Sequence, residues 1–370
     1  MAKLSPHSSA SISERLLSWY DKHHRQLPWR ISPSDQKLGF IADPYHIWLS
    51  EIMLQQTTVT AVKPYFDKFV KLWPKVENLA DGSSESVMQA WAGLGYYSRA
   101  RNLKKCADLV ALDYDGKFPQ TEAELIKLPG IGPYTAAAIA AIAFNQPAAV
   151  VDGNIERVFT RLFCIKTPLP AAKTEIKTQV AKNVPRDRPG DFAQGLMDLG
   201  SSICTPKKPN CLLCPLQTSC QASASGEQEL YPVKLPKKAK PKRQGAAFVI
   251  IDENGAIYLR KRPDTGLLAD MSEVPTTNWN SNRDGETSVD AAPLRLNWHK
   301  NGSIKHVFTH FELTLVVYSA DISTRDMTNT KLADGWWSDR EQIKNEALPN
   351  LMKKAIATAV PGAFKTNIHT

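Results

Sequence analysis

The spacing of apolar residues changes near residue 225. Before that point apolar positions recur at helical intervals, as in residues 87–94, and glycines end the repeats. After it, the apolar runs are short: residues 247–251 and 257–259 are separated by the turn sequence Asp-Glu-Asn-Gly. The pattern therefore predicts helices separated by short turns in the first part of the chain and strands in the second.

Further strands are expected at residues 303–307 and 312–320, and a helix near 351–359. Between the helical and strand-rich parts lies a polar stretch followed by a run rich in proline and lysine, which favours an extended connection. We therefore predict a multidomain protein with three parts: an all-α domain at 1–226, a Pro/Lys-rich linker at 227–244 and a smaller α/β domain at 245–370.

Length and charge narrow the class of protein. A chain of 370 residues favours two domains over one core, and a formal charge of +9 favours a polyanionic partner such as nucleic acid. Six of the cations lie between Val233 and Arg243, and without them the charge falls to +3, so much of the excess belongs to one tether-like run. No apolar stretch is long enough to cross a bilayer, and residues 1–10 lack the apolar core of a secretory signal. We expect a soluble, cytoplasmic protein with no membrane partner.

The region with the clearest chemistry holds four cysteines spaced C-x6-C-x2-C-x5-C: Cys204, Cys211, Cys214 and Cys220. Four thiolates this close together suit a [4Fe–4S] cluster and equally a tetrahedral zinc ion. Two disulfides would need an oxidising compartment, which nothing at the N-terminus indicates. The other two cysteines, Cys106 and Cys164, lie in apolar helical surroundings and are predicted to be inert core thiols.

A Leu-Pro-Gly-Ile-Gly sequence ending at Gly132 predicts a hairpin between two helices. Thr121 and Glu124 form a capping-box pattern for the first helix, and Pro133 suits the first position of the second. Gly130 and Gly132 permit the tight backbone between them. The start of the second helix offers free N–H groups to an anion such as a DNA phosphate, although an isolated motif of this kind is as often an ordinary corner.

Three more segments complete a recognisable set: Leu-Pro-Trp-Arg at 27–30, Ser-Glu-Ile-Met-Leu-Gln-Gln-Thr at 50–57 and Gly-Leu-Gly-Tyr-Tyr-Ser-Arg at 93–99. With the hairpin, Val-Asp-Gly-Asn at 151–154 and the four cysteines, they resemble the helix–hairpin–helix DNA glycosylases, and most closely the adenine DNA glycosylases of the MutY family. The resemblance covers nearly the whole chain. It implies a glycosylase domain with a [4Fe–4S] cluster loop at 204–220, followed by a Nudix-like domain that recognises 8-oxoguanine.

Two carboxylates fit the chemistry that this resemblance implies. Cleaving a purine N-glycosidic bond requires an acid to protonate the leaving base and a negative charge near the cationic sugar. Glu51 lies among apolar residues that would raise its pKa, and Asp152 lies in a glycine-containing loop before a helix. The resemblance assigns protonation of adenine N7 to Glu51 and stabilisation of the sugar to Asp152, which Asn154 positions. Taken alone, Glu51 would be a solvated helix acid and Asp152 a helix N-cap.

Tyr134 indicates the subclass of glycosylase. Bifunctional enzymes resembling endonuclease III carry a lysine at this position, which forms a Schiff base with the sugar and allows strand cleavage. A phenol cannot form one, so we expect a monofunctional glycosylase without β-lyase activity, in which Tyr134 supports Asp152. A mismatch-directed thymine glycosylase can also carry tyrosine here, but the related short-chain enzymes generally lack the C-terminal domain.

The resemblance also implies contacts with DNA. Base chemistry in a duplex requires the nucleotide to leave the stack. Gln56 and Tyr96 match the residues that wedge into the stack, and Trp29 and Arg30 match residues that line the pocket for the extruded adenine. Phosphate contacts are expected from the hairpin glycines and from the loop between the first two cluster cysteines: Gly130, Gly132, Lys207 and Lys208.

The C-terminal domain is predicted to recognise a base rather than to hydrolyse a nucleotide. Residues 266–292 lack the Arg-Glu-x2-Glu-Glu helix that binds magnesium in Nudix hydrolases. Phe308, Thr309 and His310 match the Phe-Ser-His loop that reads 8-oxoguanine in the family. Ser272 and Val274 stand where the family usually has aromatic residues, and residues 31–43 are longer than the usual connection and are expected to form a surface loop.

The function expected from the sequence is excision of adenine opposite 8-oxoguanine or guanine in duplex DNA, in base excision repair, by a monomer in the bacterial cytoplasm at the nucleoid. A glycosylase of the same fold with another base preference is the first alternative. A cluster-bearing DNA-binding protein without catalysis is the second, and the joint presence of Glu51, Tyr134 and Asp152 weighs against it.

Overall fold

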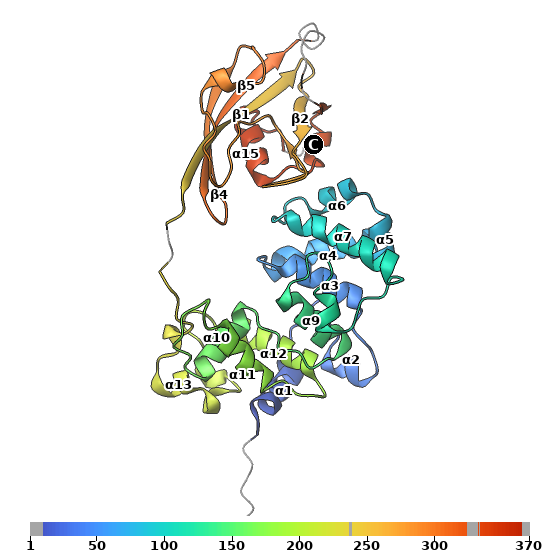
Figure 1. Ribbon diagram of the computed structural model, residues 1–370, viewed down its shortest axis with the longest axis vertical. Helices are drawn as coiled ribbons and strands as arrows, with labels where there is room; N and C mark the ends of the chain where they lie inside the picture. The colour runs from blue at the N-terminus through green and yellow to red at the C-terminus, as the bar shows by residue number, and fades with distance from the viewer. Residues whose placement is uncertain (1–9, 237–238, 324–331, 333, 365–370) are drawn as a thin grey trace, which may run out of the picture. The chain divides into compact units, whose positions relative to one another are not determined.

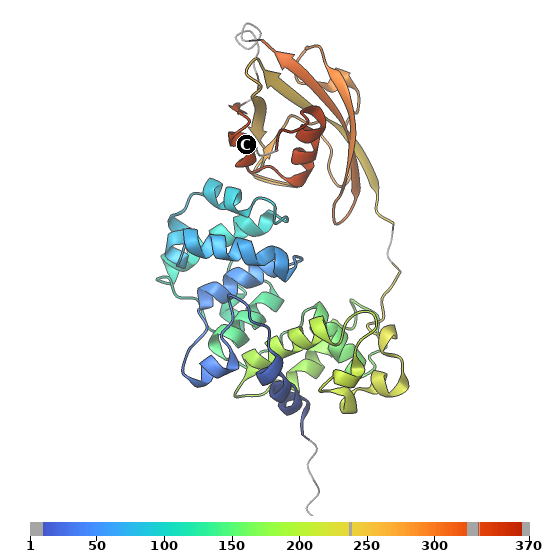
Figure 2. The ribbon, with the colours of Figure 1, turned by 180° about the vertical axis from the view of Figure 1, so that it is seen from behind.

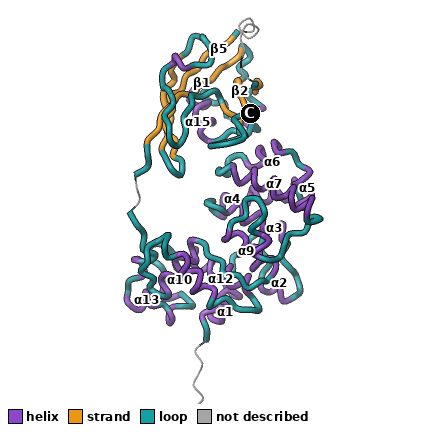
Figure 3. The backbone as a smooth tube through the Cα atoms, viewed as in Figure 1, coloured by secondary structure: helices purple, strands orange, loops and turns teal. Residues whose placement is uncertain are grey.

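A computed structural model of the protein describes residues 10–236, 239–323, 332 and 334–364 (Figure 1). These residues form two compact units, one of 10–81 with 102–236, and one of 82–101 with the described residues from 239 onward. Helices dominate the first unit, whereas the sheet of the protein lies in the second (Figure 3). This arrangement confirms the predicted fold class.

The α-helices up to residue 225 are α1 (Ile12–His23), α2 (Pro33–Lys37), α3 (Pro44–Leu54), α4 (Val59–Leu72), α5 (Val76–Asp81), α6 (Ser84–Trp91), α7 (Ser98–Asp113), α8 (Glu122–Leu125), α9 (Pro133–Phe144), α10 (Gly153–Leu162), α11 (Lys173–Ala181), α12 (Pro189–Ser202) and α13 (Gln221–Ser225). Short 3-10 turns lie before α13 at Cys211–Leu213 and Gln217–Ser219, and after it at Gln228–Leu230. Within the described ranges, none of these helices combines the length and apolar character that a membrane span requires.

Helix α9 forms the centre of the first unit. Its sequence is rich in alanine and nearly free of polar residues, so all sides of the helix can be buried, and it packs against both α3 and α12. Gly190 of α12 allows a close approach, because a Cβ atom there would lie 2.6 Å from the carbonyl oxygen of Ala141. Small residues thus bring together three helices that carry polar side chains of the site.

Some local predictions need correction. Thr121 caps α8 by accepting from the Glu124 N–H at 3.3 Å, but the helix has only four residues. Residues 31–43 are not entirely loop, because Ser32 caps the short helix α2. Cys106 is buried as predicted, whereas Cys164 is partly exposed, with a φ of +47° just after α10, so the prediction of a core thiol there is wrong.

The sheet of the second unit is mixed (Figure 2). Its strands are β1 (Lys242–Asp252), β2 (Ile257–Lys261), β3 (Ser272–Glu273), β4 (His299–Val307), β5 (Glu312–Ile322) and β6 (Gly335–Ser338). Their order is β3-β2-β1-β5-β4, with β6 also paired to β2, and β1 runs parallel to β5 whereas the other pairs are antiparallel. The four strands predicted from sequence are confirmed as β1, β2, β4 and β5, and the predicted C-terminal helix is α15 (Asn350–Ala359).

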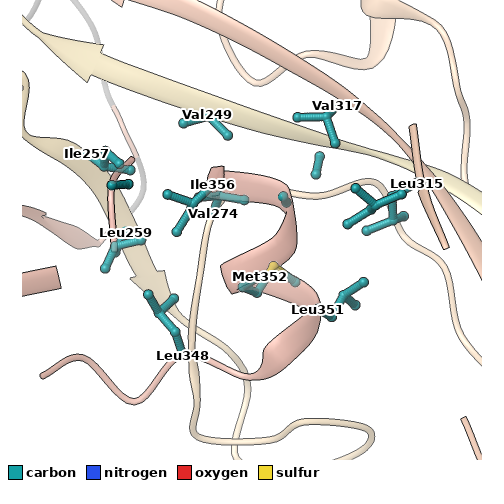
Figure 4. Close-up of a cluster of buried hydrophobic side chains, with 14 of the residues drawn as sticks. Val249, Ile257, Leu259, Val274, Leu315, Val317, Leu348, Leu351, Met352 and Ile356 are labelled. Atoms are coloured by element: carbon teal, nitrogen blue, oxygen red, sulfur yellow. The ribbon is translucent and has the colours of Figure 1, made fainter. Parts of the chain in front are cut away.

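Strand β1 is buried on both faces, which explains its continuous apolar run. Ala247 and Val249 face the larger core, whereas Phe248 on the opposite face stacks on Tyr318. Helix α15 closes the larger core with Leu351, Met352 and Ile356, which point toward the sheet in Figure 4. Because successive side chains of a strand point to opposite faces, this continuous run contributes to two separate apolar layers.

The predicted connection at 227–244 has structure at both ends. Tyr231 is buried, and the Leu169 N–H donates to the Val233 carbonyl at 2.9 Å, so this part lies against the first unit. Strand β1 already begins at Lys242.

Candidate active site

The first unit contains a cavity of about 950 Å³ lined by α3, α9, the start of α10, α12 and the segment before α2. Nine residues that the sequence indicated line it together: Trp29, Arg30, Glu51, Gln56, Gly130, Gly132, Tyr134, Asp152 and Asn154. They come from segments up to 125 positions apart in the chain, so packing of the helices creates the site.

Glu51 on α3 is almost completely buried, with an exposed fraction of 5%. The Tyr134 hydroxyl donates to its Oε2 at 2.9 Å. Burial raises the pKa of Glu51 to about 7, and the negative charge of Asp152 adds to this rise; the hydrogen bond from Tyr134 and the charge of Arg30 act in the opposite direction. A carboxyl group with such a pKa can hold a proton and release it near neutral pH.

Asp152 is the N-cap of α10. Its Oδ1 accepts from the Ile155 N–H at 2.7 Å and its Oδ2 accepts from Asn154 Nδ2 at 2.9 Å. The carboxylate thus lies at the positive end of the helix dipole and is held by two donors. The N-cap role does not exclude a chemical one, because the same side chain also lines the cavity.

Tyr134 occupies the first turn of α9, and the charges of both carboxylates act on it. Burial chiefly, and then the charges of Glu51 and Asp152, hold the pKa of its phenol well above the usual range. The phenol therefore stays protonated and acts as a donor. Its hydrogen bond goes to Glu51, whereas the sequence predicted that it supports Asp152.

Arg157 connects the Asp152 end of α10 with the cysteine-rich loop. It donates to Asn154 Oδ1 at 2.8 Å, to the Gly200 carbonyl at 2.7 Å and to the Cys204 carbonyl at 2.7 Å. Gly200 leaves room for this contact, since a Cβ atom there would lie 2.6 Å from the Asn154 Cβ. Asn154 is thus fixed from two sides.

The four sequence-predicted cysteines line one small pocket together with Arg161. Arg161 is buried and donates to Cys204 Sγ at 3.3 Å and to the Thr205 carbonyl at 2.8 Å. A buried guanidinium beside several thiols is suited to a centre with negatively charged thiolate ligands. In the described part of the chain, no three His, Cys, Asp or Glu side chains are placed to hold a single metal ion.

The hairpin and the predicted wedge residues have strained or special backbones. Gly130 has a φ of +76°, and a Cβ atom there would lie 2.7 Å from the Asn102 Cβ, so glycine is required. Gln56 and Tyr96 have φ values of +57° and +48°, which are uncommon for residues with side chains. Both side chains are exposed. Such strain is found preferentially at functional positions.

The remaining predicted residues lie outside the cavity. Lys207 and Lys208 are exposed on the cysteine-rich loop of the first unit. In the second unit, Phe308 stacks on Phe311 with ring centroids 4.7 Å apart, and Thr309 and His310 are exposed at the turn after β4. The turn thus exposes two polar side chains next to a stacked pair of phenylalanine rings.

Several residues that line the cavity were not indicated by sequence motifs, among them Arg25 before α2, and Gln194, Met197 and Ser201 on α12. Asp198, also on α12, does not line the cavity but is hydrogen-bonded to Arg30, which does. Asp198 is 1% exposed and accepts from Arg30 Nη1 at 2.8 and 3.0 Å. The signal that could have found it is its position: Gln194 and Asp198 are polar residues four apart on one face of a buried helix.

These features coincide with known families. Residues 49–186 match the HhH-GPD superfamily of base excision DNA repair proteins, and residues 246–358 match the NUDIX domain. The protein is therefore a DNA glycosylase of the helix–hairpin–helix class with a Nudix-like second domain.

Whole-chain similarity gives the family. The chain is 34% identical over 396 residues to the human adenine DNA glycosylase, covering 92% of this chain and 72% of that protein. It is 35% identical over 306 residues to the adenine DNA glycosylase of Buchnera aphidicola subsp. Acyrthosiphon pisum, covering 82% and 84% of the two chains. A solved thermostable thymine-DNA glycosylase aligns with a TM-score of 0.51 and 31% identity, over 58% of this chain and 95% of that one. The chain belongs to the adenine DNA glycosylase family.

Proposed function

We propose that this protein hydrolyses the N-glycosidic bond of adenine paired with 8-oxoguanine or guanine in duplex DNA. The observation that carries the proposal is the buried Glu51 carboxyl, bonded to Tyr134 and with its pKa raised to about 7, in the same cavity as Asp152. The names of the similar proteins in human and Buchnera support adenine as the base.

In the proposed reaction Glu51 gives its proton to N7 of the extruded adenine. The bond between base and sugar then breaks, and its electron pair leaves with the base. Asp152 stabilises the resulting sugar cation and adds to it transiently. Water then displaces the carboxylate, and the proton released from that water returns to Glu51, which restores both groups.

The presence of tyrosine at position 134 supports a monofunctional glycosylase, whose product is an abasic site in an unbroken strand. The Tyr134 phenol is held as a donor to Glu51 and has no amine with which to form a Schiff base. We infer that the DNA strand stays intact until alkali is added.

DNA contacts are proposed for residues in each of the two units. Gln56 and Tyr96 combine exposure with left-handed backbones, as expected for residues that enter the base stack. The N–H groups after Gly132 are not capped by a side chain, which leaves them available to a phosphate together with Lys207 and Lys208. Trp29 and Arg30 form part of the pocket for the base.

We propose a [4Fe–4S] cluster on the four cysteines, supported by their common pocket and by the buried Arg161 beside it. When bound, the cluster would supply four metal–thiolate links that fix the loop carrying Lys207 and Lys208. Replacing Cys211 by Ser should reduce the iron content of the purified protein from about four per chain. Replacing the partly exposed Cys164 by Ser is the matched control, and equal iron loss in that variant would contradict the ligand set.

For the opposite base we propose the turn formed by Phe308, Thr309 and His310. Thr309 keeps a hydroxyl that can bond to the edge of 8-oxoguanine, and the stacked Phe308 and Phe311 support the turn from below. Recognition of 8-oxoguanine fits a second domain at residues 245–370, joined to the glycosylase domain at 1–226 through 227–244. We also propose that the enzyme acts as a monomer in the bacterial cytoplasm, at the nucleoid where duplex DNA is found.

A single-turnover assay on matched duplexes tests the function. Adenine should be released from A:8-oxoguanine and A:G pairs, with strand breakage appearing only after alkali. Release of thymine from a G:T pair instead would favour the activity named for the similar thermostable glycosylase. Binding without release of any base would contradict catalysis.

A further inference from the structure

Asp198 on α12 is a buried carboxylate that faces two arginines. Its side chain is 1% exposed. Its oxygens accept from the Arg25 backbone N–H at 2.9 Å, from Arg25 Nε at 2.5 Å and from Arg30 Nη1 at 2.8 and 3.0 Å. A buried carboxylate with this many charge-assisted hydrogen bonds fixes the groups around it.

Arg30 stands between Asp198 and the proposed proton donor. Its side chain is only 7% exposed and lines the cavity together with Glu51. The hydrogen bonds of Arg30 go to Asp198, although its positive charge is felt at Glu51. The carboxylate behind Arg30 therefore determines where this guanidinium points.

The charged and titratable groups that act on Glu51 belong to three structural elements. Tyr134 approaches from α9, Asp152 from the start of α10, and Arg30 from the segment before α2. Asp198, with Arg25 on its other side, lies behind Arg30. Of these groups Arg30 carries the positive charge that could pair with an ionised Glu51.

We propose that Asp198 is a positioning residue: by holding Arg30 through two hydrogen bonds and balancing its charge, it keeps this guanidinium from pairing with Glu51. The inference rests on the proposed role of Glu51 as the proton donor. Without the Asp198 carboxylate, Arg30 would keep a buried charge, and Glu51 is the other carboxyl group whose charge acts on it.

The consequence has a definite sign. Pairing with a cation favours the ionised carboxyl and lowers its pKa, typically by about 1–3 units. Glu51 acts in its protonated form, so the excision rate declines as pH rises through its pKa. Loss of the Asp198 charge should therefore move this decline to lower pH.

The test is the pH profile of single-turnover adenine excision by the full-length Asp198→Asn protein on an A:8-oxoguanine duplex. We expect the midpoint of the alkaline decline to fall by about one pH unit, so that the rate at pH 8 drops about tenfold, whereas the rate at about pH 5.5 changes less than threefold. A purely structural defect would lower the rate equally at every pH.

The matched control is Asp191→Asn. Asp191 lies on the same helix, is 2% exposed and pairs with Arg188 at 2.7 Å, away from Arg30. The same substitution there should leave the midpoint where it is in the wild type. Combining Asp198→Asn with Arg30→Gln removes both charges and should return the midpoint toward the wild-type value.

An unchanged midpoint in Asp198→Asn, or a loss of rate that is uniform over pH, would overturn the proposal. If that variant does not fold, the double variant Asp198→Asn with Arg30→Gln decides, because it leaves neither charge unpaired. With no Arg30 present to pair with Glu51, the midpoint of the double variant should not fall below the wild-type value, and a midpoint about one unit lower overturns the proposal. Failure of the proposed role of Glu51 as proton donor is seen separately: Glu51→Gln would then excise adenine at the wild-type rate and keep the alkaline decline.

Discussion

Asp152→Asn is expected to lower the single-turnover rate of adenine excision by at least about 10³-fold while the protein stays folded. The substitution removes the negative charge that faces the sugar cation, and an amide cannot add to the sugar as a carboxylate does. It keeps the cap of α10, because asparagine accepts from the Ile155 N–H about as well as aspartate. Excision kinetics and thermal unfolding of the same preparation measure the two effects.

Asp43→Asn is the matched control for this loss. Asp43 is also an N-cap aspartate, accepts from the Tyr45 N–H at 2.8 Å and lies at the exposed start of α3. It should excise adenine at the wild-type rate. Comparable losses in the two variants would assign the effect to helix capping and remove Asp152 from the chemistry.

Glu51→Gln is expected to reduce the excision rate by about 10²–10⁴-fold, the usual contribution of a general acid. The amide has nearly the shape of the carboxyl group and can still accept from the Tyr134 hydroxyl, but it has no proton to transfer to the base. The alkaline decline centred near pH 7 should also vanish from the residual rate. Glu175→Gln, at an exposed position of α11, should keep both the rate and the decline.

The pH dependence of protein stability gives an independent measure of the pKa of the Glu51 carboxyl group. The folded-state pKa of Glu51, about 7, lies above the ordinary value of 4.5, so the folded protein holds a proton that the unfolded chain releases. Wild-type stability contributed by this group is full below pH 4.5 and declines as pH rises to about 7. The difference in unfolding free energy between Glu51→Gln and the wild type should therefore shift in favour of the variant as pH rises from 4.5 to about 7. A constant difference across pH would show that Glu51 is not held protonated by the fold.

Sequence motifs predicted the members of the site better than their contacts. Glu51, Tyr134, Asp152 and Asn154 do share one cavity, because each motif lies at the start or inner face of a helix that packs on its neighbours. The partner of Tyr134 could not be read from the sequence. It depends on the distance between α3 and α9, which small residues of α9 set through packing.

Asp198, Gln194 and Arg157 show what motif reasoning leaves out. The long-range hydrogen bonds of Asp198 and Arg157 reach residues 43 to 173 positions away. In the second unit, Trp279 packs on Phe308 with ring centroids 6.0 Å apart, although the sequence pattern there indicated only the loss of aromatic residues at Ser272 and Val274. Such contacts depend on the fold as a whole.

The sequence by itself determined the helical and strand-rich halves, the hairpin, the cysteine set and the identity of the two carboxylates. These follow from local periodicity, from glycine and proline conformations and from side-chain chemistry, all of which act over a few neighbouring residues. Only the tertiary structure decided that Glu51 is buried against Tyr134, and that Asp198 holds Arg30 beside it. Burial and charge compensation depend on which helices meet, and the pKa of a carboxyl group follows from that meeting.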